Sequence, residues 1–151
     1  MTSMRINERG FTMIELFVVF VLVGAMVAIA APRISDRLTK VSVRSARDAV
    51  ATLHAKARAA AIQRGRSTTL KVSGTSVLIT TLHPVSGVLD TIDQPTNVYS
   101  RYDGVTMTWS RDSVSFDARG IGQQSTNTTI TFSRAGYADT LVVSSVGTRI
   151  Q

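Results

Sequence analysis

The apolar positions of the chain form three successive patterns. From Phe11 to Ala31 there are twenty-one residues, and Glu15 is the only one with an ionisable side chain. A helix of this length, rising about 1.5 Å per residue, spans roughly 32 Å and matches a bilayer hydrocarbon core of about 30 Å. A single domain of this size rarely has a core thick enough to surround a helix that is apolar on every side. The first pattern therefore predicts a membrane-spanning helix over residues 11–32.

After Pro32, apolar residues return every three or four positions, which predicts an amphipathic, basic helix over residues 33–66. Its apolar positions are Ile34, Leu38, Val41, Ala46, Ala49, Val50, Leu53, Ala57, Ala60 and Ala61. Gly65 follows Arg64 as a helix stop signal. We expect one helix from Phe11 to Arg64, bent at Pro32 because proline lacks a backbone donor.

From Ser67 the period changes to two, which predicts short antiparallel strands over residues 67–151. The alternating positions are Leu70 and Val72, Val77 and Ile79, Val105 with Met107 and Trp109, Val114 and Phe116, Ile130 and Phe132, and Leu141 and Val143. Glycine-containing turns separate them, and Pro84 to Pro95 is predicted to be a long loop. The predicted fold is α+β, with a sheet packed on the 34–64 helix.

The positive charge is confined to one part of the chain. Of a net charge of +7, residues 33–66 hold nine Lys or Arg against two Asp, whereas residues 67–151 are balanced. The cations after the apolar run outnumber Arg5 and Arg9 before it. By the positive-inside rule, this charge difference favours an orientation with the C-terminus in the cytoplasm. Cysteine is absent, which excludes disulfides and thiolate metal sites.

Glu15 needs an explanation, because a carboxylate near the end of a spanning helix costs about 2 to 3 kcal/mol unless it is paired or interfacial. If the chain were cut between Gly10 and Phe11, the new α-amino group would lie one helical turn from Glu15 on the same face. In helices packed side by side with a small axial offset, the amine of one subunit then pairs with Glu15 of another.

The run Gly10-Phe11-Thr12-Met13-Ile14-Glu15 ahead of an apolar segment resembles the class III leader of type IV pilins and type II secretion pseudopilins. The resemblance implies that a prepilin peptidase removes residues 1–10 after Gly10 and methylates Phe11. It also implies that Glu15 guides assembly into a filament, and that Gly24 and Pro32 weaken the helix. The implied location is the bacterial inner membrane, with a single pass and a periplasmic C-terminal domain, against the flanking charges.

Later residues resemble one branch of this family. Lys56 to Gly65, followed by Thr69-Leu70-Lys71-Val72, is similar to the helix end and first strand of the pseudopilin H and FimT-like minor pilins. Phe116 to Gly120, Ile130 to Phe132 and Val146 to Ile150 resemble later strands of the same family. This resemblance implies a type IV pilin-like fold, filament partners that are other pseudopilins or pilins, and no enzymatic activity or cofactor.

An alternative is ordinary secretion. Ala28-Ile29-Ala30 forms an A-x-A-like site, so that signal-peptidase cleavage before Ala31 would release a soluble domain. Glu15 inside the apolar region, Pro32 just beyond the cut and the length of the apolar run argue against this interpretation.

The sequence contains no catalytic constellation. His54 and His83 lack partners at metal-ligand spacing and are interpreted as solvated or hydrogen-bonded residues. Asp90, Asp93 and Asp103 lack the dense spacing of a calcium loop and are interpreted as turn carboxylates. The pair Gly120 and Gly122 is explained by a turn, and no metal site is predicted.

DNA is the less favoured partner. The basic face of the helix is interpreted first as solvated within a filament. Lipid head groups, acidic surfaces of neighbouring subunits or DNA are the other partners that could bind it. FimT-like minor pilins that bind DNA use a C-terminal Gly-Arg-x-Arg tail, and the corresponding stretch here, Gly147 to Ile150, has one arginine instead of two. Lys71, Arg134 and Arg149 are the candidate DNA-binding residues.

We therefore expect a minor pseudopilin that assembles into the periplasmic pseudopilus of type II secretion. The alternative is a FimT-like minor subunit of a type IV pilus that binds DNA during uptake.

Overall fold

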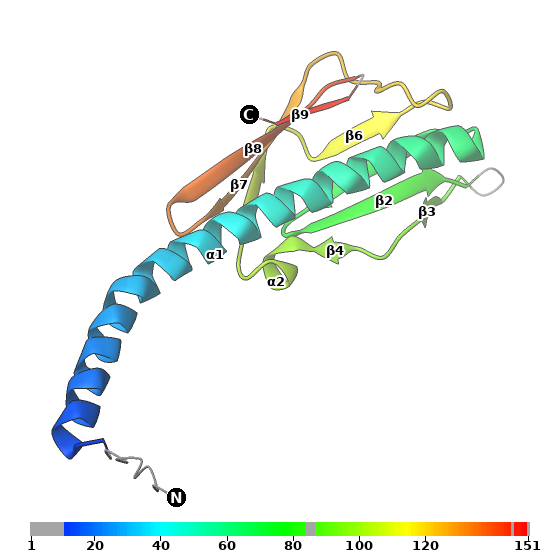
Figure 1. Ribbon diagram of the computed structural model, residues 1–151. Helices are drawn as coiled ribbons and strands as arrows, with labels where there is room; N and C mark the ends of the chain where they lie inside the picture. Colours follow the sequence, from blue (N-terminus) through cyan, green and yellow to red (C-terminus); the bar gives the residue numbers. More distant parts are fainter. Residues whose placement is uncertain (1–10, 84–86, 146, 151) are drawn as a thin grey trace, which may run out of the picture. The chain divides into compact units, whose positions relative to one another are not determined.

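The computed structural model describes residues 11–83, 87–145 and 147–150, and the predicted leader, residues 1–10, lies outside them. The chain divides into two compact units, Met1–Arg37 and Leu38–Gln151. One helix, α1 (Met13–Arg64), runs through both (Figure 1). It continues across Gly24 and Pro32 without interruption, and the predicted bend at Pro32 stays a prediction.

The end of α1 is fixed by a Schellman motif. Gly65 has φ = +60°, a conformation that glycine adopts without steric cost. Its N–H donates to the carbonyl of Ile62 at 3.2 Å, and the N–H of Arg66 donates to the carbonyl of Ala61 at 3.1 Å. These bonds satisfy carbonyls that the helix leaves unpaired, so the helix stop predicted at Gly65 is confirmed.

The second unit contains two antiparallel sheets, where the sequence predicted one. The first sheet has the order β3-β2-β1-β6, and β4 also pairs with β2. Its strands are β1 (Thr68–Ser73), β2 (Ser76–Leu82), β3 (Leu89–Thr91), β4 (Thr96–Asn97) and β6 (Ser113–Phe116). The second sheet has the order β5-β7-β8-β9. Its strands are β5 (Thr106–Trp109), β7 (Thr128–Arg134), β8 (Tyr137–Val143) and β9 (Thr148–Ile150).

A short strand, β3, contradicts the loop predicted from Pro84 to Pro95, and two more short elements, β4 and α2, lie between it and β5. β3 pairs with β2, with Leu89 opposite Leu82. After β4, a single turn of helix, α2 (Val98–Arg101), begins where the side chain of Asn97 accepts a hydrogen bond from the N–H of Ser100. Three-residue and two-residue strands are too short to show a period of two, so only their pairing identifies them.

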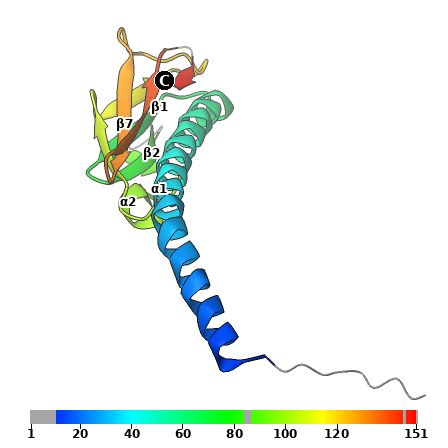
Figure 2. The same ribbon diagram turned by 60° about the vertical axis from the view of Figure 1, so that its left-hand side comes forward.

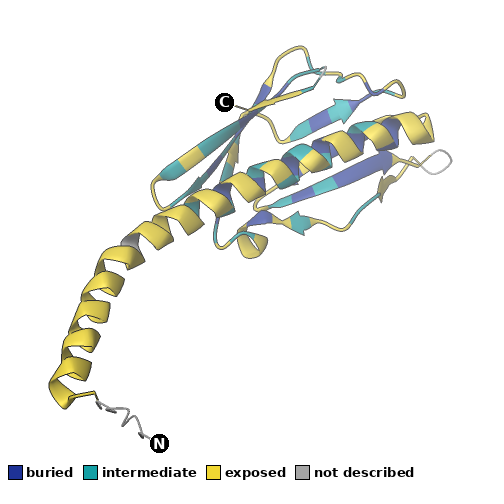
Figure 3. Ribbon diagram, viewed as in Figure 1, coloured by how far each residue is buried: buried dark blue, intermediate teal, exposed yellow. Residues whose placement is uncertain are grey.

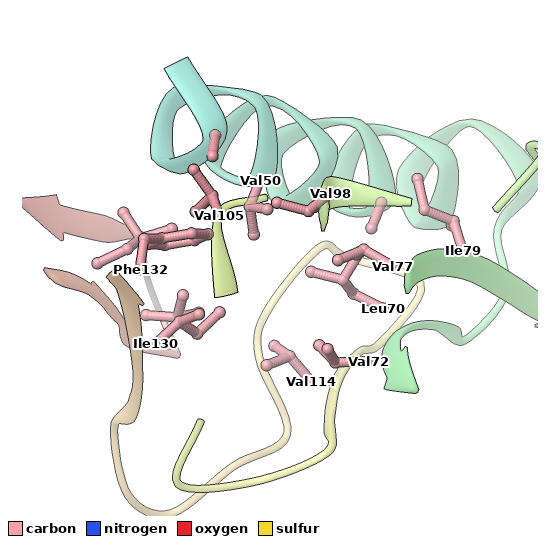
Figure 4. Packing of buried hydrophobic residues seen from close by; sticks show 14 of the residues in the cluster. Val50, Leu70, Val72, Val77, Ile79, Val98, Val105, Val114, Ile130 and Phe132 are labelled. Carbon is pink, nitrogen blue, oxygen red and sulfur yellow. The ribbon is translucent and has the colours of Figure 1, made fainter. Parts of the chain in front are cut away.

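The C-terminal half of α1 lies along both sheets (Figures 1 and 2). Its buried face is made mostly of small residues, namely Val43, Ala46, Val50, Ala57, Ala60 and Ala61. The large buried side chains come from the strands and include Phe116 and Leu141. Figure 4 shows four others, Leu70, Ile79, Ile130 and Phe132. Most of the apolar positions predicted for the 33–66 helix are confirmed, but Ile34, Leu38 and Val41 are exposed and the buried stripe begins at Val43.

Gly122 joins the two sheets. It bridges to Phe116 at the end of β6, and its N–H donates to the carbonyl of Ser145, after β8, at 2.8 Å. A Cβ atom added at Gly122 would lie 2.7 Å from the Cα atom of Ser145. Backbone cannot move aside as a flexible side chain can, so this contact requires glycine.

We predict that Gly122→Ala lowers the free energy of unfolding by about 1 to 3 kcal/mol, because the added methyl group overlaps the backbone of Ser145. Urea unfolding of a soluble fragment, residues 33–151, measures the change. Gly147→Ala is the matched control, because a Cβ atom there meets nothing within 4 Å. Equal stabilities of the two variants would contradict the contact.

Candidate functional site

The first half of α1 is a helix whose apolar surface is not covered by the chain. Every residue from Phe11 to Ala31 is exposed (Figure 3). The helix is long and apolar enough to cross a membrane, and its most apolar window is 0% buried. Exposed side chains include Phe11, Leu16, Phe17, Phe20, Leu22, Met26 and Ile29. A surface of this composition indicates a membrane or other apolar partners.

Thr12 and Glu15 form a capping box at the start of α1. The N–H of Glu15 donates to Thr12 Oγ1 at 3.3 Å, and the N–H of Thr12 donates to Glu15 Oε2 at 3.2 Å. The Thr12 hydroxyl donates to the same carboxylate oxygen at 3.2 Å. The two side chains thereby satisfy N–H groups that lack partners at the helix start. The signal is present in the sequence as Thr-x-x-Glu before an apolar run, but this capping box was not predicted.

The capping box gives Glu15 a second role besides the predicted pairing with an amine. A carboxylate in the first turn also interacts favourably with the positive end of the helix dipole. Both Thr12 donors use Oε2, and Glu15 Oε1 has no hydrogen-bond partner among the described residues. The cap therefore holds the carboxylate near the helix start and leaves one oxygen for a cation. Gly10 lies outside the described residues.

One cation of the basic helix, Arg47, is largely buried and paired within the second unit, so the face predicted to be solvated is not solvated at this position. Arg47 lies 2.7 Å from Asp139 of β8 and 2.7 Å from Asp48, and its side chain is 13% exposed. These contacts raise the pKa of Arg47, with the hydrogen bond to Asp48 as the largest cause. Because Asp139 is 10% exposed, removing one partner would leave a largely buried charge, which costs about 3 kcal/mol or more.

Two further cations of α1 also have partners in the second unit. Lys56 Nζ lies 2.6 Å from Asp93, and this pair lowers the pKa of Asp93 through its hydrogen bond and charge. The pair is exposed to solvent, so its contribution to stability is small. Lys40 Nζ lies 5.7 Å from the centre of the Tyr137 ring, within the range of a cation–π contact.

The three candidate DNA-binding residues are not brought together. Lys71 lies in β1 of the first sheet and points away from the core, between buried Leu70 and Val72. Arg134 ends β7 and contacts Asp103 at 3.3 Å and Ser42 at 3.0 Å. Arg149 lies in β9 opposite Val142.

The register separates the two arginines of the second sheet. Val142 pairs with Thr129, five positions along β7 from Arg134, which corresponds to roughly 17 Å along the strand. Lys71 belongs to the other sheet. DNA binding by these residues is therefore not supported by a common patch and stays a prediction.

His54 is buried rather than solvated. It is 3% exposed and packs edge-on against Phe116 with ring centres 5.0 Å apart, and its Nε2 atom has no hydrogen-bond partner among the described residues. Burial, with a smaller effect of the nearby charge of Arg58, lowers the pKa of His54 to about 4. The side chain is a neutral core residue and not a base facing substrate.

The described residues contain no group of three His, Asp or Glu side chains that could hold a metal ion. Asp93 and Asp103 are instead occupied by Lys56 and Arg134. Asp117 accepts hydrogen bonds from the N–H groups of Arg119 and Ile121, at 2.9 and 2.8 Å, and so forms the turn predicted at Gly120. These three carboxylates therefore serve ion pairs and a turn.

Comparison with known proteins gives one family and a small set of similar folds. The family described as type II transport protein GspH matches residues 46–147, about two thirds of the chain. The type IV minor pilin FimU of Pseudomonas aeruginosa is similar in structure, with a TM-score of 0.56 and 19% identity over 74% of this chain and 88% of that chain. The minor pseudopilin EpsH of the type 2 secretion system of Vibrio cholerae has a TM-score of 0.55 and 12% identity over 75% of this chain and 95% of that chain. A search of curated proteins finds no match. These similarities confirm the predicted fold of a long helix followed by an antiparallel β-sheet domain.

We predict that His54 makes the domain sensitive to acid. The folded state holds the pKa at about 4, below the ordinary 6.5, so its stabilising effect is complete above pH 6.5 and declines as the pH falls toward 4. The free energy of unfolding should fall by about 3 kcal/mol across this range. Urea unfolding of residues 33–151 at several pH values measures it. In His54→Leu, the free energy of unfolding should depend less on pH between 4 and 6.5, and the control variant His83→Gln should keep the dependence. An unchanged pH dependence in His54→Leu would refute the assignment to His54.

Proposed function

The chain belongs to the GspH family of type II transport proteins and is a pilin-like structural subunit rather than an enzyme, and we propose that it is a minor pseudopilin of type II secretion. In this proposal the subunit joins other pseudopilins in a periplasmic filament that serves protein secretion. The observation that carries the proposal is the exposed apolar half of α1, which begins with a capped carboxylate at Glu15.

Processing at Gly10 supplies the second half of the assembly contact. Cleavage after Gly10 by a prepilin peptidase creates an α-amino group on Phe11, one residue before the helix cap at Thr12. The free Oε1 atom of Glu15 then accepts the amine of a neighbouring subunit, while Oε2 stays in the capping box. A paired cation offsets the cost of a carboxylate next to an apolar environment.

The same helix serves the membrane and the filament in turn. Before assembly, residues 11–32 span the inner membrane once, with the sheet domain in the periplasm. After assembly, the apolar side chains contact helices of neighbouring subunits, whose surfaces have the same composition. Gly24 and Pro32, at which helical structure is weakened, are proposed to let the helix adjust to the two surroundings.

The effect of the negative charge of Glu15 can be separated from the effect of helix capping by its side chain. Glutamine retains an oxygen that accepts the Thr12 N–H, as in other capping boxes, but has no charge. We predict that Glu15→Gln and Glu15→Leu both reduce incorporation into filaments by about tenfold or more, because an amine loses its counter-charge. Thr12→Ala, which removes the cap and keeps the charge, should have a much smaller effect. Incorporation is measured as the amount of chain in the sheared filament fraction relative to the membrane fraction.

Mass spectrometry of the mature chain is the control for this series. Under the proposal, the N-terminus is methylated Phe11, and Gly10→Ala leaves the leader attached. A mature N-terminus at Ala31 would identify a secreted soluble domain and exclude the proposal. Normal incorporation of Glu15→Gln would show that Glu15 acts through helix capping and not through an ion pair.

A second candidate is a FimT-like minor pilin of a type IV pilus that binds DNA. It is favoured by Arg149, which is exposed on the edge strand β9 and has no ion-pair partner among the described residues. This candidate predicts a gel shift with residues 33–151 that weakens as salt rises. Arg149→Ala should weaken the shift, and Arg134→Ala should weaken it less because Asp103 already contacts Arg134. Absence of a shift at low salt would exclude this candidate.

A further inference from the structure

The cations that follow the apolar half of α1 lie in one stripe. Arg33, Arg37, Lys40, Arg44 and Arg47 are spaced by four, three, four and three residues. Side chains at these spacings lie on the same face of a helix. The stripe is therefore a continuous run of positive charge that begins just after the apolar segment.

The partners of the stripe differ along its length. Arg47 is held by Asp139 and Asp48, and Lys40 lies over the ring of Tyr137. Arg33 and Arg37 are exposed, and neither has an ion-pair partner among the described residues. Asp36, three residues after Arg33, forms no ion pair with it. The first two cations of the stripe are therefore free to bind a ligand.

Their position identifies the ligand. Arg33 and Arg37 follow the last residue of the apolar run, Ala31, by two and six residues, or about 3 and 9 Å along the helix axis. The polar layer on each side of a bilayer core is roughly 5 to 7 Å thick. Arginine side chains extend along the helix toward polar groups, so both guanidinium groups reach the level of the lipid phosphates.

We propose that Arg33 and Arg37 bind the phosphate groups of anionic phospholipids in the leaflet where the spanning helix ends. The proposal rests on the proposed function, in which residues 11–32 cross the membrane. Guanidinium groups present parallel N–H donors that fit phosphate oxygens, and each cation near an anionic surface strengthens association by roughly fivefold.

Such binding accounts for the unusual distribution of flanking charge. The positive-inside rule disfavours a run of cations on the far side of a spanning helix. When two of these cations are neutralised by lipid phosphates, they act as an anchor. The contact fixes the depth of the helix in the membrane and must be released when the subunit enters a filament.

The absence of cysteine allows a direct test on the full chain. Ser35→Cys, at an exposed position between the two arginines, provides a single site for a fluorescent donor. The labelled chain is reconstituted into phosphatidylcholine vesicles that contain a minority of phosphatidylglycerol. Energy transfer to labelled phosphatidylglycerol is then compared with transfer to labelled phosphatidylcholine. We expect enrichment of phosphatidylglycerol around the donor by about threefold or more, decreasing as salt rises.

Two double variants decide the assignment. Arg33→Gln/Arg37→Gln should abolish the enrichment, whereas Arg111→Gln/Arg119→Gln, at exposed positions of the sheet domain, should leave it unchanged. Equal transfer to the two lipids in the unaltered chain would overturn the proposal. So would enrichment that survives Arg33→Gln/Arg37→Gln while filament incorporation is lost, because the arginines would then serve a neighbouring subunit. Mass spectrometry measures processing separately. If phosphatidylglycerol is not enriched although the mature chain begins at Phe11, the lipid site alone is overturned. If the mature chain begins at Ala31, both proposals are overturned.

Discussion

The chain depends on one helix whose two halves meet different surroundings. From Val43 to Ala61, one face of α1 is buried by two sheets and the opposite face is exposed. From Phe11 to Ala31, the whole circumference is apolar apart from Thr12 and Glu15 and is exposed. Burial of apolar surface is the main favourable term in folding and association, so the uncovered half must be covered by lipid or by other chains. The first half of α1 is long and apolar enough to serve as a membrane anchor.

The buried half of α1 shows how a helix can support two sheets at once. Its core positions are mostly alanine, and the volume of the core comes from Phe116, Phe132 and other large residues of the sheets. Gly122 adds a close backbone contact between the end of β6 and Ser145. Arg47 and Asp139 connect the helix to β8 through a largely buried ion pair. The sheet domain is therefore held to its helix by packing and by charge.

The cations of the basic helix have different roles, which the net charge of the chain does not distinguish. Arg47 stabilises the packing of the domain, whereas Lys56 forms an exposed pair with Asp93. Arg33 and Arg37 remain open at the end of the apolar run. Glu15, the single charge within that run, is bound into the helix cap by Thr12 and still presents one oxygen. Both ends of the apolar segment thus have polar groups suited to partners outside the chain.

Sequence alone determined the features that depend on neighbouring residues. The spanning length, the helix stop at Gly65 and the main alternating strands such as β1 and β7 follow from local periodicity and backbone preference. The capping box of Thr12 and Glu15 was also readable, although it was missed. Tertiary structure alone decided the division into two sheets, the short strand β3, the burial of His54, and the pairing of Arg47 with Asp139, 92 positions away. It also decided that Lys71, Arg134 and Arg149 lie apart. These features depend on which distant strands pair and in which register, and a local pattern of apolar and polar residues is compatible with many such pairings.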